Sequence, residues 1–291
     1  MNIGFVILCY GNYPIVCKCI NLLRKLKHIE ETSIVIVDNA SPDRTGNKIK
    51  EKTKNIKNIT VLLNDKNSGF AKGNNIGYSY TVNNLGCEIV VVMNSDVFIE
   101  DEDFISKLQN EIRNNKDVAL IAPDVIGSKG SHTNPFGRKM LALKDAKKEL
   151  RIKKILWLLM LTHLDFYKKV TKKRREKDNN ANANVEQVVQ DGIVPHGSCI
   201  IFCEQWTTKE KDAFYPNTFL YYEEFFLHTY ALKKGYKIRY IPSLAVRHIG
   251  DASLDNSVSD DRKKRLFTIK YQIQSLNKYV DFMKDLNRND R

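Results

Sequence analysis

Val90-Val91-Val92-Met93-Asn94-Ser95-Asp96-Val97 is the stretch around which the chain is organised. An apolar run closed by polar residues is typical of a strand buried on both faces of a parallel sheet. Ligands of such sheets bind just beyond the carboxyl ends of the strands. We therefore expect Asp96 to lie at a ligand site, where its carboxylate binds a divalent metal and, through it, a diphosphate.

Strands and helices alternate in the N-terminal half of the sequence. Apolar runs predict strands at residues 3–10, 33–37, 59–63, 88–93 and 118–122, with helices between them. This order predicts an α/β fold with a mostly parallel sheet flanked by helices, and residues 1–125 as a nucleotide-binding half. No Walker sequence is present, and the first turn lacks a Gly-x-Gly-x-x-Gly fingerprint, which argues against a dinucleotide site.

The C-terminal half is less regular. We predict strands at residues 197–203 and 237–241, and helices at 219–234 and 260–287. Residues 126–255 are assigned to a second half that completes the site, and residues 256–291 to a basic C-terminal helix. The apolar face predicted for that helix consists of Leu266, Ile269, Ile273, Leu276, Tyr279, Val280 and Met283.

Charge and cysteine usage restrict the class of protein. The net charge of +13 favours an anionic partner, which is a nucleic acid, an anionic membrane surface or a phosphorylated substrate. The six cysteines form no zinc-binding pattern, so we expect buried free thiols in a reducing cytosol. No signal peptide opens the sequence, and the longest apolar run, 155–161, is too short to span a bilayer.

That apolar run lies in a strongly basic segment, residues 143–178, followed by a polar stretch at 179–184. Lysines around a Leu, Trp and Met core are typical of a helix in a membrane interface. A nucleic-acid patch usually interleaves aromatic residues or glycine instead, so we expect no nucleic-acid partner. A buried helix with a solvated lysine face is the remaining alternative.

Five segments point to a family. They are Asp38-Asn39-Ala40-Ser41, Asn67-Ser68-Gly69-Phe70-Ala71-Lys72-Gly73-Asn74-Asn75-Ile76-Gly77, Met93-Asn94-Ser95-Asp96, Phe219-Leu220-Tyr221-Tyr222-Glu223-Glu224-Phe225-Phe226-Leu227 and Val246-Arg247-His248-Ile249-Gly250. In this order the chain resembles the family 2 glycosyltransferases of the GT-A fold. It is most similar to the bacterial branch that adds rhamnose or similar sugars to cell-surface polysaccharides.

The resemblance implies a donor and metal site. Asn94-Ser95-Asp96 takes the place of the family's Asp-x-Asp motif, so Asp96 would bind Mg²⁺ or Mn²⁺, helped by His248. Such a cation neutralises the charge that develops on the leaving diphosphate. The residues expected to bind the nucleotide-diphosphate sugar are Tyr10, Asp38, Asn67, Gly69, Lys72, Asn74, Asn94 and Ser95.

The resemblance also implies a catalytic base, which must accept the proton of the acceptor hydroxyl. Glu223-Glu224 takes the place of the family's Glu-Asp pair, and Phe226 replaces a later acidic residue. We favour Glu224 as the base and keep Glu223 as the alternative. His196 is a candidate contact for the acceptor.

The predicted function is inverting transfer of a sugar from a UDP- or dTDP-linked donor to a glycan acceptor in cell-surface polysaccharide synthesis. The acceptor would be linked to a polyprenyl diphosphate lipid, and the enzyme would be cytoplasmic and peripheral at the inner face of the cell membrane. The C-terminal helix could instead form a homodimer. The rival interpretations are a sugar-nucleotidyltransferase and a non-catalytic peripheral membrane protein.

Overall fold

The computed structural model describes residues 1–161, 187–250 and 261–289. The second part of the predicted basic segment, the polar stretch at 179–184 and residues 251–260 lie outside the described residues. Of the six cysteines, all are buried and free, as the sequence predicts.

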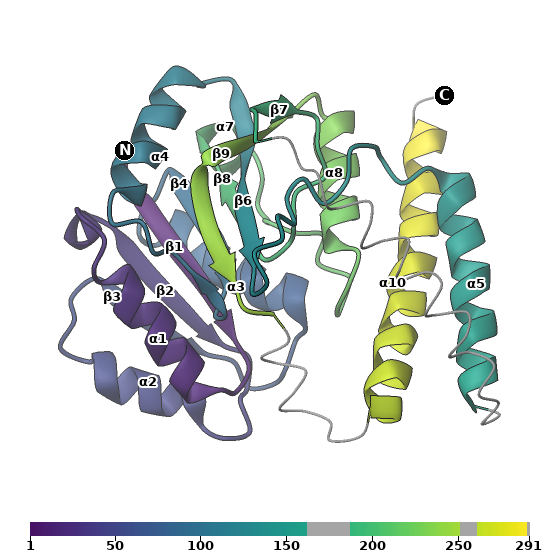
Figure 1. Cartoon of the computed structure of the whole chain (residues 1–291), viewed down its shortest axis with the longest axis horizontal. Helices are drawn as coiled ribbons and strands as arrows, with labels where there is room; N and C mark the ends of the chain where they lie inside the picture. The colour runs from purple at the N-terminus through teal and green to yellow at the C-terminus, as the bar shows by residue number, and fades with distance from the viewer. Residues whose placement is uncertain (162–186, 251–260, 290–291) are drawn as a thin grey trace.

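Within the described ranges, nine strands form one sheet, in the order β3-β2-β1-β4-β8-β6-β9-β5, with β7 paired to β9 (Figure 1). The N-terminal strands are all parallel, and so are β6 and β9, whereas β8, β5 and β7 pair antiparallel with their neighbours. The predicted α/β sheet is therefore confirmed. The strands are β1 (Ile3–Cys9), β2 (Ser33–Asp38), β3 (Ile59–Leu63), β4 (Ile89–Asn94), β5 (Val97–Phe98), β6 (Val118–Gly127), β7 (Gln190–Asp191), β8 (Cys199–Phe202) and β9 (Lys237–His248).

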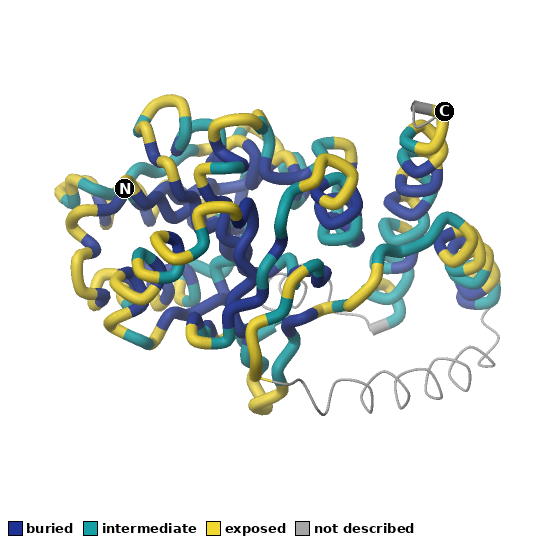
Figure 2. Tube along the Cα trace, turned by 90° about the horizontal axis from the view of Figure 1, so that it is seen from above, coloured by how far each residue is buried: buried dark blue, intermediate teal, exposed yellow. Residues whose placement is uncertain are grey.

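Helices cover both faces of this sheet because successive strand residues point to opposite sides. Alternate residues of β1 and β4 pack with α1, α2 and α4 on one face, and the intervening residues pack with α3, α7 and α8 on the other. Figure 2 shows the buried residues gathered along the strands between these layers. The helices are α1 (Tyr13–Leu23), the short 3₁₀ turn η1 (Ile29–Glu31), α2 (Thr45–Thr53), α3 (Phe70–Asn83), α4 (Phe104–Asn114), α5 (Leu143–Leu161), α7 (Glu204–Thr207), α8 (Glu223–Lys233) and α10 (Asp261–Asn289).

Most of the predicted site residues lie at one edge of the sheet, the one at which its parallel strands end. The carboxyl ends of β1, β2, β4, β6 and β9 share this edge, because the antiparallel strand β8 separates β4 from β6 and so leaves those two parallel. The amino end of β8 lies at the same edge, since β8 is antiparallel to β4 and β6. Helices α3 and α8 also begin there, because each leads into the next strand of the parallel set, β4 or β9. The segments after β2 and β4 and before β8 and α8 therefore meet there.

Strand β9 is much longer than the sequence predicts. The sequence pattern ends the strand at Ile241, beyond which His248 lies, but the strand continues to His248. Its pairing with β6 is interrupted after Ile241 and resumes at Ala245, so an irregularity that includes Pro242 shifts the register without ending the strand. The predicted end of this strand is therefore wrong.

Helices α5 and α10 pack side by side at the edge of the molecule (Figures 1 and 2). The apolar face predicted for α10 is buried or half-buried and contacts α5 and α8, as the sequence predicts. A homodimer through α10 would therefore have to use a different face. In α5, Leu156 and Met160 face α10, whereas Ile155, Leu158 and Leu161 are exposed.

The described helices include none that is both long and apolar enough to span a membrane.

We expect Leu276→Ala to lower the free energy of unfolding by about 2–5 kcal/mol, because it opens a cavity in a close-packed cluster. Leu276 belongs to α10 and is fully buried against residues of α5 and α8. Urea unfolding measures the change, with Gln274→Ala, at an exposed position of the same helix, as the control. Equal stability of the two variants would contradict the packing of α10 described above.

Candidate active site

Asp96 and His248 are brought together by the pairing of two strands. Strand β5 starts directly after Asp96 and pairs antiparallel with the end of β9, so that Val97 lies opposite His248. The Ile249 amide donates to the carbonyl of Asp96 at 3.1 Å, which closes the pairing. His248 Nε2 is 3.4 Å from Asp96 Oδ2, and Asp96 is only 7% exposed.

This pair fits two ligand positions of one divalent cation. Neighbouring ligands of an octahedral Mg²⁺ or Mn²⁺ ion, each about 2.1 Å from the metal, lie about 3 Å apart. The observed 3.4 Å between the carboxylate oxygen and the imidazole nitrogen is close to that separation. A carboxylate with an imidazole suits Mn²⁺ better than Mg²⁺.

His196 lies against His248. Their ring centroids are 5.6 Å apart, in an edge-to-face arrangement. The Ser198 amide donates to His196 Nδ1 at 3.2 Å, so the proton of the neutral imidazole is on Nε2. Burial, with a smaller contribution from the neighbouring His248, lowers the pKa of His196 to about 4, and Asp96 opposes the shift. His196 is therefore a neutral imidazole near pH 7.

Glu223 and Glu224 occupy the first turn of α8. Burial raises the pKa of Glu224 to about 7 and, together with the charge of Glu224, raises that of Glu223 to about 8. Glu223 is 3% exposed, and no described group hydrogen-bonds its Oε1. Glu224 as a residue is half-buried, so it is the less buried of the two.

Gly197 connects Glu224 with the histidines. A Cβ atom built on Gly197 would lie 3.7 Å from Glu224 Oε2, so this carboxylate abuts the residue that follows His196. Asp96, His248, His196 and Glu224 thus form a continuous group at the carboxyl edge of the sheet. The structure brings the two predicted metal ligands, the favoured base and the acceptor candidate together.

The loop that precedes Glu223 is held by α5 and α10. Tyr222 donates to Glu149 of α5 at 2.8 Å, and Ser275 of α10 donates to the Leu220 carbonyl at 2.8 Å. Tyr221 and Tyr222 both have positive φ, 72° and 70°, a backbone conformation that is unfavourable for bulky residues. These tertiary contacts maintain that conformation. They thereby fix the position of the first turn of α8, which carries both carboxylates.

On the donor side, Asp38 ends β2 and is 6% exposed. It accepts hydrogen bonds from the hydroxyl of Ser41 and, at 3.2 Å, from the Ser41 amide, while that hydroxyl accepts the Gly11 amide at 2.6 Å. This network ties the turn after β1, which carries half-buried Tyr10, to the turn after β2. A Cβ atom on Gly46 would lie 2.5 Å from Cβ of Asp38, so the glycine is needed for this arrangement.

Asn39 organises the glycine-rich segment, a role that sequence reasoning missed. Its amide group donates to Asn67 Oδ1 at 2.9 Å and to the Gly69 carbonyl at 3.2 Å. Gly69 has φ 82°, and a Cβ atom there would lie 2.5 Å from the Phe219 carbonyl oxygen. The predicted donor segment is therefore packed directly against the loop that leads to Glu223.

The remaining donor candidates are placed less uniformly. Asn94 and Ser95 are half-buried at the end of β4, next to Asp96, and the Asn94 amide donates to the Ser198 carbonyl at 2.9 Å. Asn74 is fully buried, and its Oδ1 accepts no hydrogen bond from any described residue. Lys72 is exposed and lines a groove of about 890 Å³ beside edge strand β3, with no described contact to Asp96.

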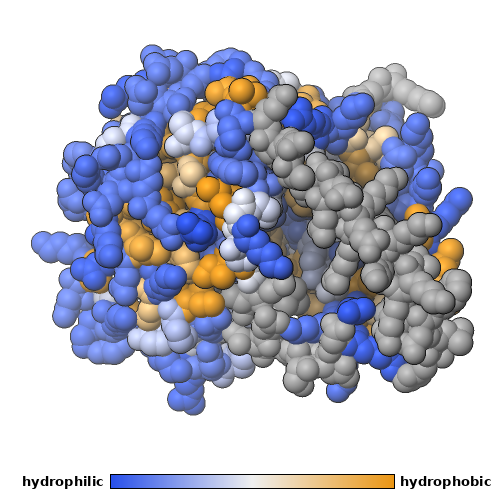
Figure 3. All heavy atoms as spheres, in the orientation of Figure 1, coloured by the Kyte–Doolittle hydropathy of each residue, from blue (hydrophilic) through white to orange (hydrophobic). Residues whose placement is uncertain are grey.

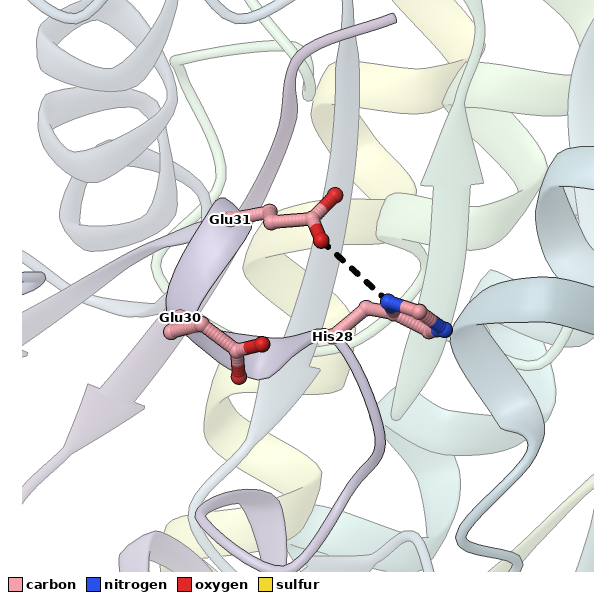
Figure 4. Close-up of side chains that lie close together, drawn as sticks. All are labelled: His28, Glu30 and Glu31. Carbon is pink, nitrogen blue, oxygen red and sulfur yellow. Dashed lines mark hydrogen bonds and ion pairs between the residues drawn. The ribbon is translucent and has the colours of Figure 1, made fainter.

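A second arrangement of metal-ligand side chains lies elsewhere. In the part of the chain that the structure describes, three such side chains come close together only at His28, Glu30 and Glu31 (Figure 4). All three are exposed, and His28 Nδ1 is 3.2 Å from Glu31 Oε1. They precede β2 and so lie at the amino edge of the sheet, away from Asp96, which leaves them outside the site.

A family comparison agrees with this geometry. The family model described as Glycosyl transferase family 2 matches residues 5–181, more than half of the chain. The chain belongs to this family. The match includes β1 to β6 and Asp96. Curated proteins give no match.

Solved structures of GT-A glycosyltransferases share the fold. The mannosyltransferase PcManGT from Pyrobaculum calidifontis, in complex with GDP-Man and Mn²⁺, matches 96% of this chain and 71% of that chain, at 12% identity and a TM-score of 0.55. Residues 1–349 of S. aureus TarS in complex with UDP match 92% of this chain and 70% of that chain, at 15% identity and a TM-score of 0.55. The TarS complex with UDP-GlcNAc matches only 45% of this chain and 36% of that chain, at 23% identity and a TM-score of 0.39. The predicted GT-A fold is thus confirmed.

We expect Glu223→Gln to remove a pH dependence of stability. Between the ordinary carboxyl pKa of 4.5 and the folded value of about 8, the folded chain keeps a proton that the unfolded chain releases. The free energy of unfolding therefore falls as pH rises through this window, and the variant, which has no proton to lose there, gains stability relative to the native chain.

Urea unfolding at several pH values between these limits measures the difference. Glu102→Gln, at an exposed position, is the control and should follow the native chain. A stability difference between Glu223→Gln and the native chain that does not change with pH would contradict the buried, protonated carboxyl.

Proposed function

We propose that this family 2 glycosyltransferase moves a sugar from a UDP- or dTDP-linked donor to a hydroxyl of a glycan acceptor, with inversion at the anomeric carbon. The observation that carries the proposal is the juxtaposition of two groups at one edge of the sheet. Asp96 and His248 lie 3.4 Å apart, and Glu224 abuts Gly197 beside the neighbouring His196. Leaving-group stabilisation and proton acceptance are the two tasks that this transfer requires.

Glu224 is the proposed base. Burial raises its pKa to about 7, which makes it a stronger proton acceptor than an exposed carboxylate while much of it is still ionised near neutral pH. Glu223, with a pKa of about 8, is mostly protonated there and serves to support the turn. A single displacement by the deprotonated hydroxyl leaves no covalent intermediate, so the product has inverted stereochemistry.

The donor is expected to lie along the carboxyl ends of β1, β2 and β4. Asp38 and Asn67 would contact the nucleoside, with Tyr10, Gly69, Asn74, Asn94 and Ser95 around it, and Lys72 remains a candidate only if its side chain turns toward the phosphates. Asp96 and His248 would hold Mg²⁺ or Mn²⁺, which supplies positive charge next to the leaving diphosphate. The structural neighbours support this choice, because one contains GDP-Man with Mn²⁺ and another contains UDP.

Nucleotide release tests the reaction. UDP- and dTDP-sugars are incubated with the enzyme and Mn²⁺, and release of UDP or dTDP is followed. We expect Asp96→Ala to lower the rate at least about a hundredfold, and Glu224→Gln to lower acceptor-dependent transfer about 10²–10⁴-fold. The rate of the native enzyme should rise with pH and level off above about pH 7, as Glu224 loses its proton.

Asp103→Asn, at an exposed carboxylate that pairs with Lys27 outside the site, is the control for Asp96→Ala. Unchanged turnover in Asp96→Ala would contradict the metal assignment. A product that keeps the donor's anomeric configuration would contradict the single displacement, and an absence of nucleotide release with every donor would favour the non-catalytic alternative.

The acceptor is proposed to be linked to a polyprenyl diphosphate lipid, with the enzyme bound to the inner face of the cell membrane. Support comes from the outer side of α5, where Lys147, Arg151 and Lys154 are exposed beside the exposed Ile155 and Leu158, which are 57% and 56% accessible. In Figure 3, hydrophobic atoms emerge among hydrophilic ones at the right-hand edge, where α5 lies in Figure 1. Basic residues next to apolar ones suit the surface of an anionic bilayer.

Flotation with lipid vesicles tests this placement. We expect binding to vesicles of mixed phosphatidylglycerol and phosphatidylcholine, weakened by salt and lost in Ile155→Ser/Leu158→Ser. Ile76→Ser, at another exposed apolar position, is the control and should bind as the native chain does. Equal flotation of the double variant would contradict a role for α5.

A further inference from the structure

Phe136 is an exposed aromatic residue that belongs to no proposed task. It lies in the connection between β6 and α5 and is 45% exposed. Its backbone is nevertheless fixed by two hydrogen bonds. The Phe136 amide donates to the Val194 carbonyl at 3.0 Å, and the Val194 amide donates to the Gly137 carbonyl at 2.8 Å. These two hydrogen bonds hold the backbone of Phe136 in one place at the surface.

The segment around Phe136 is anchored by a buried asparagine. Asn134 is fully buried, donates to the Pro123 carbonyl at 2.7 Å and accepts the His196 amide at 2.7 Å. One side chain thus positions both the connection that carries Phe136 and the segment that carries His196 and Gly197. The relative placement of Phe136 and the candidate active site is therefore determined by the buried core of the protein.

The ring of Phe136 contacts two residues of that site. It lies edge-to-face with His196, at a centroid distance of 5.5 Å and an interplanar angle of 81°. It also contacts Phe225, the residue after Glu224, at 5.8 Å and 60°. Gly197, the residue after His196, abuts Glu224. The side chains of Phe136 and His196 and the proposed base Glu224 are therefore contiguous.

We propose that Phe136 and His196 form the subsite that binds the acceptor sugar, with the pyranose packed on the exposed phenyl ring. This inference rests on the proposed function, because it needs the acceptor hydroxyl to reach Glu224. One face of a pyranose ring is made largely of C–H groups, which pack on an aromatic ring, while the hydroxyls around it need polar partners. The Nε2–H group of His196 is such a partner beside the phenyl ring, because the other ring nitrogen, Nδ1, accepts the Ser198 amide.

The position of the subsite favours a saccharide over a lipid chain. Phe136 contacts polar His196 as well as the half-buried ring of Phe225, which follows Glu224, so this apolar surface lies directly beside polar groups. A sugar fits this mixture of one flat apolar contact and adjacent hydrogen-bond donors.

Saturation-transfer difference NMR tests the subsite directly, with the full chain, UDP and Mn²⁺ present. The probes are the methyl glycosides of glucose, galactose, mannose, N-acetylglucosamine and rhamnose. We expect at least one glycoside to receive saturation, strongest on the C–H groups of one ring face. Phe136→Ala should weaken binding about tenfold or more, and Phe136→Trp, which keeps a flat ring, should retain it.

The controls separate this subsite from the reaction itself. Leu232→Ala removes another exposed apolar side chain, on α8, and should bind the glycosides as the native chain does. Equal UDP binding by Phe136→Ala and the native chain checks that the variant is folded. Unchanged glycoside binding in Phe136→Ala, or no binding of any glycoside to the native chain, would overturn the proposal. Nucleotide release from the donor is measured separately, without these glycosides. Its absence would overturn the proposed function rather than the subsite.

Discussion

The candidate site depends on the antiparallel pairing of two residues of β5 with the end of β9. This short pairing puts Val97 opposite His248 and so brings Asp96 within 3.4 Å of the imidazole. Asp96 follows the central strand β4, whereas His248 ends β9, far from Asp96 along the chain. Any shift of register by one residue would turn the His248 side chain to the other face of the sheet.

The base-bearing side of the site depends on a different set of contacts. The loop before α8 lies between the segment around Gly69 and the helices α5 and α10. It accepts hydrogen bonds from the Phe70 amide and from Ser275 of α10, and its Tyr222 donates one to Glu149 of α5. Ordering this loop costs conformational entropy and backbone strain at Tyr221 and Tyr222, which the surrounding contacts offset. The outer side of α5 is the surface proposed to contact the membrane. The same helix would thus link the proposed membrane contact with the position of Glu224.

Much of the fold follows from local patterns in the sequence. Apolar runs located the strands of the parallel half, and the period of α10 identified its buried face, because these signals depend on residues close together in the chain. The antiparallel insertion of β8 and the continuation of β9 past Pro242 depend on long-range pairing, which a local pattern does not contain.

The same distinction holds for the site. Asp96 follows a recognisable strand, and the Glu223-Glu224 pair was selected through the family resemblance. Asn39 and Asn134 could not be selected, because they act by contacts with residues elsewhere in the fold. A glycine inside a predicted helix, such as Gly46, is a signal of close packing that could have been used. Lys72 met the expected pattern, but its position on α3 faces a groove beside β3.

The central claim is that Asp96 and His248 hold a divalent cation together with the donor diphosphate. Two protein ligands leave most positions of the ion to phosphate oxygens and water, so the protein alone should bind it weakly. Electron paramagnetic resonance of Mn²⁺ measures free and bound metal directly. The account predicts little bound Mn²⁺ without nucleotide, a clear increase on adding UDP or dTDP, and loss of that increase in Asp96→Ala. Tight Mn²⁺ binding without nucleotide, or an unchanged increase in Asp96→Ala, would contradict it.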